Sequence, residues 1–112
     1  MAKLERDLTG SFDRLLDYLH DGILNGSSSA SWEDSSDYDG INFRCAVRVY
    51  ERYSFMGGNR VSLNLTLVGE GNQLFLSAIT AGGSQAVFFK VNTLGEEAFL
   101  DKLEELLDAW EG

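Results

Sequence analysis

The sequence predicts an α+β fold, a two-layer sandwich of an antiparallel meander sheet and two helices, in the order strand, helix, four or five strands, helix. Apolar residues recur at helical spacing near both ends of the 112-residue chain. Between these ends, short stretches alternate between apolar and polar residues and are separated by glycine turns. Connections this short force antiparallel neighbours. A chain of this length suits a single domain, residues 1–112.

The first elements follow from residues 3–25. Residues 3–9 alternate in a way that suits a short strand, although an extension of the first helix is the open alternative. Ser11 is a candidate helix N-cap, and Asn25-Gly26 a candidate helix end. The apolar stripe between them consists of Phe12, Leu15, Leu16, Leu19 and Ile23. These residues predict an amphipathic helix.

The next two strands are predicted to form a hairpin. The serine-rich, acidic residues 27–38 are interpreted as an edge strand, and Asp39-Gly40 as a two-residue turn that sets Trp32 opposite Val47. The second strand alternates, so that its more apolar face is expected to point to the core. That face carries Phe43, Cys45, Val47, Val49 and Tyr53. Arg44, Arg48 and Arg52 would then form a stripe on the outer face of the sheet.

The remaining elements are two or three strands and a long helix. Residues 61–67 alternate cleanly, whereas residues 74–79 and 86–89 are apolar on both faces and predict central or doubly covered strands. Thr93 and Glu96 match a capping box that would begin a helix running to about Trp110. Its buried stripe would contain Phe99, Leu103, Leu106, Leu107 and Trp110.

Charge and composition argue against several classes of protein. The formal net charge is −9, and the field of such a chain repels a phosphate backbone, so no nucleic acid partner is expected. No stretch approaches the roughly 20 apolar residues of a membrane span, and the amino terminus has no signal-peptide pattern. We therefore expect a cytoplasmic protein with no membrane partner. The single cysteine, Cys45, is expected to pack in the core.

No catalytic constellation stands out. His20 is the only histidine and is predicted to be a partly buried helix residue. The chain lacks a nucleophile elbow and a phosphate-binding loop, and it holds too few histidine and cysteine residues for a metal site of that type. The sequence thus predicts a protein that is not an enzyme, with no catalytic residue, no metal and no cofactor.

The leading functional hypothesis is an interaction or binding module. Residues 41–92 are net basic, whereas residues 1–40 and 93–112 are acidic. A basic and aromatic sheet face could therefore contact the acidic helices of a second copy or of another protein. The candidate face comprises Arg44, Arg48, Tyr50, Arg52 and Lys90, together with Phe88. A homodimer through this face is the expected form.

The alternative hypothesis is a carrier or sensor of a small apolar or anionic ligand. The order of elements is similar to that of TATA-binding-protein-like and helix-grip folds, and helix-grip relatives often hold a hydrophobic ligand between the sheet and the last helix. That similarity implies a pocket lined by Phe99, Leu103 and Trp110. Simple core packing of these three side chains competes with this interpretation, because a small domain can spare little volume.

Most of the chain resembles an uncharacterised family of small bacterial proteins. Three stretches carry the resemblance: CAVRVYERY at 45–53, GGNRVS at 57–62 and SAITAGGSQAVFF at 77–89. The resemblance implies a bacterial, cytosolic setting. It implies no activity, because the family has no assigned function, catalytic residue or ligand.

Overall fold

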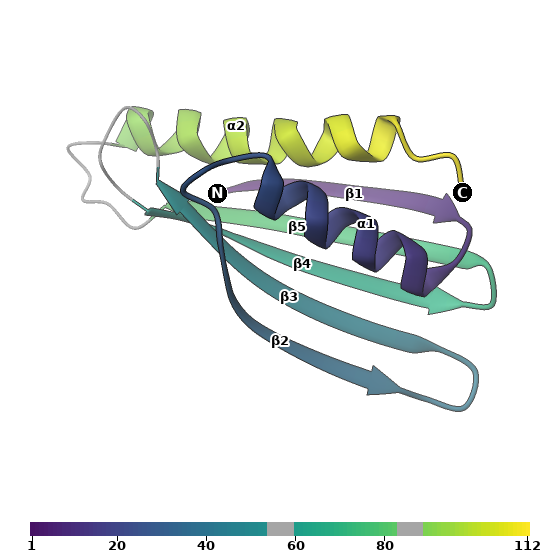
Figure 1. The fold of residues 1–112 in the computed structure, drawn as a ribbon. Helices are drawn as coiled ribbons and strands as arrows, with labels where there is room; N and C mark the ends of the chain where they lie inside the picture. Colours follow the sequence, from purple (N-terminus) through teal and green to yellow (C-terminus); the bar gives the residue numbers. More distant parts are fainter. Residues whose placement is uncertain (54–59, 83–88) are drawn as a thin grey trace.

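The computed structural model describes residues 1–53, 60–82 and 89–112 and has the predicted α+β architecture (Figure 1). The elements are β1 (Ala2–Thr9), α1 (Phe12–Asn25), β2 (Ser31–Asp39), β3 (Arg44–Tyr53), β4 (Arg60–Glu70), β5 (Gln73–Gly82) and α2 (Phe89–Asp108). The strands form one antiparallel sheet in the order β1-β5-β4-β3-β2. Both helices lie on the same face of this sheet, so the fold has two layers.

The open alternative at the amino terminus is resolved in favour of a strand. β1 pairs antiparallel with β5, from Ala2 opposite Thr80 to Thr9 opposite Gln73. Its burial alternates along the strand, as expected for a strand with one covered face. The chain therefore begins on the far side of the sheet from β2, and β5 becomes an interior strand.

α1 begins and ends where the sequence predicts. The side-chain oxygen of Ser11 accepts a hydrogen bond from the backbone N–H of Arg14 and caps the first turn. The predicted apolar stripe is buried against the sheet. Gly26 closes the helix in a right-handed conformation with φ −78°. The helix ends there because the serine-rich segment follows.

The centre of the core is built by the inner faces of β4 and β5, which are the faces toward the helices. The buried side chains of these two strands are Val61, Leu63, Leu65, Leu67, Leu74, Leu76, Ala78 and Thr80. Phe99, Leu103 and Leu107 of α2 pack on them, and α2 lies over β4, β5 and β1. β5 is paired on both sides but is not covered on both faces, since Phe75 and Ile79 are exposed on its other face.

The hairpin of β2 and β3 has a different register from the predicted one. Asp39 pairs with Arg44, so the turn holds four residues, and Trp32 lies opposite Tyr50 rather than Val47. The backbone N–H of Gly40 donates to the carbonyl of Phe43 at 2.7 Å, and this bond closes the longer turn. A bulge between Trp32 and Asp34 shifts the register again. The prediction of a two-residue Asp39-Gly40 turn was therefore wrong.

The start of the last helix also differs from the prediction. α2 begins at Phe89, so Thr93 and Glu96 lie inside it and do not form a capping box. Residues 86–88 of the expected strand lie outside the described residues, and Phe89 belongs to the helix. Glu96 is buried and accepts a hydrogen bond from the backbone N–H of Gly82 at 2.8 Å. This carboxylate therefore ties α2 to the end of β5. Among the described residues, neither helix is long and apolar enough to cross a membrane.

Candidate functional site

The arginine stripe of β3 lies on the face of the sheet opposite to the predicted one. Ala46 and Tyr50 are buried under the helices, and alternation places Arg44, Arg48 and Arg52 on this same inner face. The register explains the inversion, because Tyr50 pairs with Leu63 and Arg48 with Leu65, and both leucines belong to the core. The predictions that Tyr50 is exposed and that Cys45 packs in the core were wrong.

Each of these arginines is accommodated at the margin of the core. The Arg44 guanidinium lies 4.4 Å from the centre of the Phe12 ring and pairs with Asp13 and Asp39. These two hydrogen-bonded carboxylates raise the pKa of Arg44. Arg48 pairs with Asp37 at 2.9 Å.

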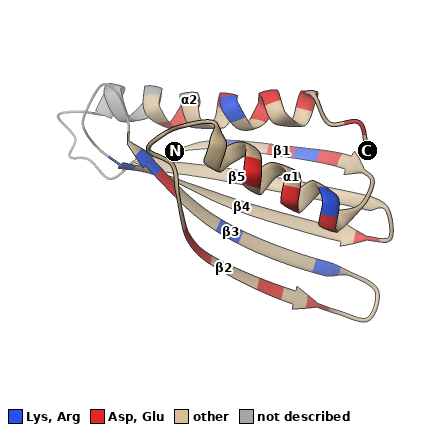
Figure 2. Cartoon of the chain, viewed as in Figure 1, with Lys and Arg blue, Asp and Glu red and all other residues tan. Residues whose placement is uncertain are grey.

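The remaining members of the expected basic face are Arg52 and Lys90. Arg52 lies over the ring of Phe99 at 4.5 Å. Lys90 lies in the first turn of α2 instead of on a strand, and Phe88 is outside the described residues. The five predicted residues therefore do not form one exposed face. Acidic residues recur along α1 and β2, the elements on either side of the basic positions of β3, and also along α2 (Figure 2).

A hydrogen bond joins α1 to the centre of β3. The Nδ1 atom of His20 lies 2.7 Å from the Tyr50 hydroxyl, and the edge of the Trp32 ring packs against the imidazole with 5.0 Å between ring centres. His20 is partly buried, as the sequence predicts. Its imidazole satisfies the only polar atom of a fully buried tyrosine side chain. We infer that the contacts among His20, Tyr50 and Trp32 position β2 and β3 beside α1.

Alkaline pH should destabilise the protein through Tyr50. Burial raises the pKa of Tyr50 to about 12, and Asp21 adds to the rise while Arg48 opposes it. In the unfolded chain the phenol releases its proton near pH 10, so the free energy of unfolding should fall from about pH 10 to pH 12. The expected loss from Tyr50 alone is about 2–3 kcal/mol.

Urea unfolding of wild type and Tyr50→Phe at pH 8, 10 and 11 measures this loss. At pH 8 the variant should be less stable by about 1–2 kcal/mol, because the imidazole of His20 loses its partner. The difference should shrink above pH 10. Tyr53→Phe, which removes an exposed phenol, is the matched control. Equal pH dependence in wild type and Tyr50→Phe would contradict the assignment.

The outer face of the sheet, which neither described helix covers, carries three rows of residues that run across all five strands. The first row is Asp7, Phe75, Val68, Cys45 and Tyr38. The second row is Glu5, Ser77, Thr66, Val47 and Ser36, and the third is Lys3, Ile79, Asn64, Val49 and Asp34. On the middle three strands the first row is apolar throughout, whereas the second and third rows also contain Ser77, Thr66 and Asn64. Four of the six marginal residues are charged: Asp7, Glu5, Lys3 and Asp34.

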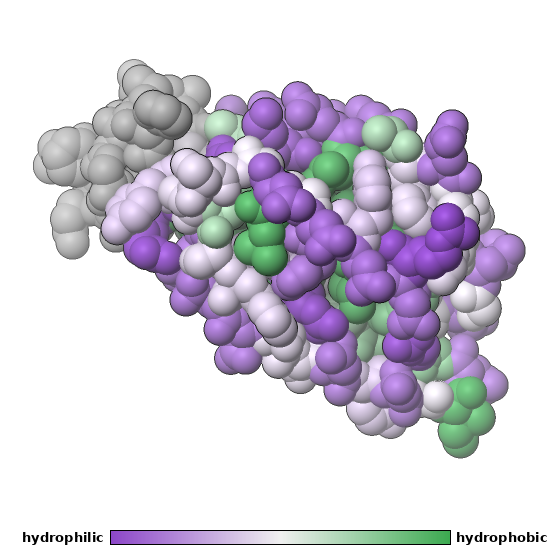
Figure 3. Space-filling view, viewed as in Figure 1, coloured by the Kyte–Doolittle hydropathy of each residue, from purple (hydrophilic) through white to green (hydrophobic). Residues whose placement is uncertain are grey.

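Large apolar side chains of this outer face are in contact with solvent. The exposed fractions are 38% for Phe75, 40% for Ile79 and 62% for Tyr38. The helix side is different: viewed with α1 in front of the sheet, its surface is mostly hydrophilic, with small separate hydrophobic patches (Figure 3). Large apolar side chains that are exposed on one face are a feature of interaction sites.

The edge of β2 is built to resist pairing with another strand. It carries four acidic residues, Glu33, Asp34, Asp37 and Asp39, within nine positions, and the bulge after Trp32 interrupts its ladder. Charges and bulges are the usual means by which proteins protect an edge strand. An association of this protein is therefore more favourable through the outer face than through extension of the sheet at β2.

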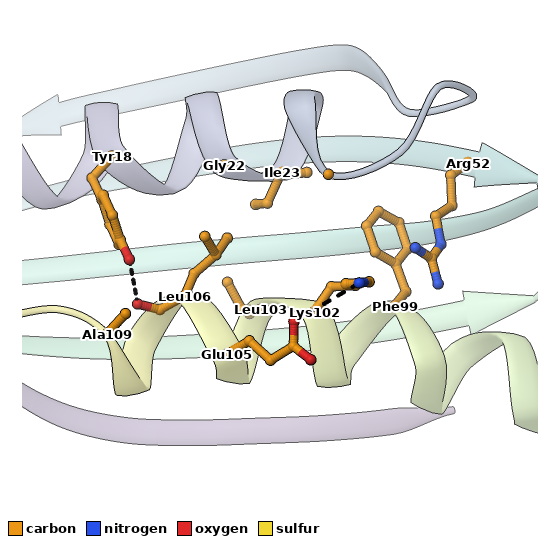
Figure 4. Close-up of a pocket in the computed structure, with 11 residues that line it drawn as sticks. Tyr18, Gly22, Ile23, Arg52, Phe99, Lys102, Leu103, Glu105, Leu106 and Ala109 are labelled. Atoms are coloured by element: carbon orange, nitrogen blue, oxygen red, sulfur yellow. Dashed lines mark hydrogen bonds and ion pairs between the residues drawn. The ribbon is translucent and has the colours of Figure 1, made fainter.

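A pocket of about 210 Å³ lies between α1 and α2 (Figure 4). Phe99 and Leu103 line it, as predicted, but its opposite wall is formed mainly by Tyr18, Gly22 and Ile23 of α1 and by the C-cap Gly26, and the sheet contributes Arg52. Trp110 does not line it. This tryptophan follows α2, packs against Tyr18 with the two rings tilted, and donates from its indole nitrogen to the carbonyl of Thr9 at 3.2 Å.

The sequence contains signals for two features that the sequence analysis missed, the apolar outer face of the sheet and the glycines in the pocket wall. The outer face could have been found from β4, whose unambiguous alternation of Val61, Leu63, Leu65 and Leu67 determines the phase of its neighbours once the register is known. The glycine wall of the pocket, Gly22 and Gly26, has the four-residue spacing of one helix face. Among the described residues, no group of three potential ligands could hold a metal ion.

The comparison with known proteins gives one family. No curated protein matches the chain. A family model described as "Family of unknown function (DUF6054)" matches residues 1–111, which confirms the resemblance to an uncharacterised family. The bacterial setting and the cytoplasmic location stay predictions. The chain belongs to this family of unknown function, DUF6054.

Proposed function

We propose that this chain is a non-enzymatic interaction module that forms a homodimer through the outer face of its sheet. The observation that carries the proposal is the row of apolar side chains across β5, β4 and β3, exposed on a face that neither described helix covers. A second sheet stacked at about 10 Å would remove these side chains from water. The proposed surface replaces the basic and aromatic face expected from the sequence.

The size of the face suits a second copy. Four inter-strand spacings of about 4.8 Å and strands of about 30 Å give a footprint of roughly 570 Å². Because side chains roughen the surface, the accessible area buried per copy would be somewhat larger, near the roughly 800 Å² of a standard stable interface. A face-to-face dimer can therefore be stable without other contacts.

One pair of marginal charges, Lys3 and Asp34, is complementary across a twofold axis. β4 is the middle strand, so a twofold axis parallel to β4 and between two stacked sheets places β1 of one copy over β2 of the other. Within the third row, Lys3 then faces Asp34 of the second copy, and the contact occurs twice. In the first row, the Tyr38 hydroxyl can donate to the Asp7 carboxylate.

A charge swap tests this arrangement. Lys3→Glu should weaken the dimer about tenfold, because two favourable pairs become repulsive, and Lys3→Glu combined with Asp34→Lys should restore most of the affinity. Sedimentation velocity over a range of concentrations measures both effects. Lys102→Glu on α2 makes the same change in net charge away from the face and should leave the dimer unchanged. Equal weakening by this control, or no restoration in the double variant, would contradict the proposed axis.

Nucleic acid is not a partner in this proposal. Arg44, Arg48 and Arg60 are each paired with carboxylates of the same chain, and the net charge is −9. Phosphate contacts would require these ion pairs to break against an unfavourable overall field.

The second candidate function is a carrier or sensor of a small ligand. The observation that favours it is the pocket between α1 and α2, where Arg52 meets apolar walls. A ligand bound there would not compete with dimerisation, because the helices and the outer face lie on opposite sides of the sheet. Retention of a small molecule by the purified protein would support this candidate, and native mass spectrometry detects it.

A further inference from the structure

The pocket between α1 and α2 has two glycines in the wall that α1 and its C-cap provide. Gly22 and Gly26 are one turn apart and line the wall. At Gly22 the two helices are in close contact, since a Cβ atom built there would lie 2.6 Å from a methyl carbon of Leu106. The Tyr18 hydroxyl donates to the carbonyl of Leu106 at 2.7 Å and holds α1 and α2 together beside the pocket. The cavity is therefore framed by two helices joined by direct contacts.

Arg52 is the cation of this pocket that has no anionic partner. Its guanidinium lies over the ring of Phe99 and beside the apolar wall (Figure 4). No carboxylate of the described residues lies within ion-pair distance of it, whereas Lys102, the other cation of the lining, lies 3.8 Å from Glu105. Residues 54–59 and 83–88 contain no aspartate or glutamate. In a chain with twice as many acids as bases, this lack of a partner singles out Arg52.

The environment of Arg52 favours an anion. Partial burial lowers the pKa of its guanidinium, yet an arginine keeps its charge at neutral pH. A partly desolvated cation gains more from a carboxylate than an exposed one does, because water competes less. The guanidinium also offers a planar fork of donors, of which the Phe99 ring covers only one face.

We infer that the pocket binds a small amphipathic carboxylate, with its carboxylate on Arg52 and its hydrocarbon part along Phe99, Leu103 and Leu106. The volume of about 210 Å³ is below the range typical of drug-sized ligands, so a short acyl or aryl acid fits better than a long lipid. This inference rests on the second candidate function and gives that candidate its ligand class. It does not depend on dimerisation.

Fluorescence of Trp110 can report the binding of octanoate. Trp110 packs against Tyr18, which lines the pocket, with 5.2 Å between ring centres. The chain has two tryptophans, so Trp32→Phe leaves Trp110 as the only one. In this background, octanoate should change the emission in a saturable way. Because the charged head group is part of the recognition, 1-octanol and octylammonium should bind more weakly by about tenfold or more.

Variants at Arg52 separate charge from folding. Arg52→Gln should weaken octanoate about tenfold or more, and Arg52→Lys should recover part of the affinity. Arg14→Gln, which removes an arginine that does not line the pocket, is the control and should bind as wild type. Circular dichroism checks that each variant is folded.

The outcomes distinguish the inference from the function on which it rests. Selective binding of octanoate that is lost in Arg52→Gln supports the inference. Equal affinity for octanol and octanoate, or unchanged binding in Arg52→Gln, would contradict recognition of a carboxylate by Arg52. The protein would then remain a candidate carrier of apolar ligands. No saturable response to any of the three probes overturns both the inference and the carrier function.

Discussion

If the protein dimerises as proposed, Phe75→Glu is expected to give a folded monomer. Phe75 is the second residue of the first row of the outer face, between Asp7 and Val68, and across the twofold axis it faces Cys45 of the second copy. A glutamate here would bury two unpaired carboxylates in each dimer, next to Asp7. We expect the dissociation constant to rise at least about a hundredfold, which corresponds to roughly 3 kcal/mol or more. Sedimentation equilibrium measures this change.

Ile41→Glu is the matched control for this variant. Ile41 is fully exposed in the turn between β2 and β3, so the same kind of substitution there removes an exposed apolar side chain outside the three rows. It should leave the dimer intact. A Phe75→Glu variant that dimerises like the Ile41→Glu variant would contradict the proposed interface, provided that urea unfolding shows both to be folded.

Ala46→Asp is expected to unfold the protein, whereas Val47→Asp should leave the monomer folded. Ala46 is buried on the inner face of β3, opposite Leu67, so a carboxylate there would be buried without a partner. That cost is several kcal/mol, comparable to the whole stability of a small domain. Val47 lies on the outer face opposite Thr66, where an aspartate remains in water in the monomer. Circular dichroism and urea unfolding at low concentration measure the difference.

This pair of variants tests which face of β3 is buried against the helices. The interpretation drawn from sequence alone has Val47 in the core and the alternate positions outside, so it expects the reverse result. A folded Ala46→Asp together with an unfolded Val47→Asp would therefore contradict the face assignment, and with it the proposed interface.

The fold was predictable because most elements carry their own signals. α1 has a serine cap and an apolar stripe of helical period, and β4 alternates over its whole length. These signals are local. They determine the order of the elements and the antiparallel pairing, because short connections leave few alternatives.

The phase of β3 was not predictable because both of its faces contain apolar and polar residues. Phe43, Cys45, Val47 and Val49 form the more hydrophobic face by composition. The structure buries the other face because Tyr50 finds a partner in His20, and because arginine stems can cover the core margin while their charges pair outside it. His20 and the carboxylates that pair with the arginines come from other parts of the chain. The alternation of residues within β3 therefore cannot predict these contacts.

The start of α2 and the pocket depend on tertiary contacts in the same way. Thr93 and Glu96 match a capping box, but the carboxylate of Glu96 bonds to Gly82 of β5, so the local signal is overridden. The similarity to helix-grip folds implied Phe99 and Leu103 as pocket residues, and both line the pocket. It did not identify α1 as the opposite wall, since that depends on how the two helices pack.

The oligomeric state of the wild-type protein tests the central claim most directly. Sedimentation equilibrium of the native chain, from low micromolar to millimolar concentration, gives its mass without a variant or a label. The proposed interface requires a reversible approach to twice the 12.4 kDa mass of one chain. A mass of 12.4 kDa at every concentration would contradict the claim that the outer face of the sheet is a homodimer interface.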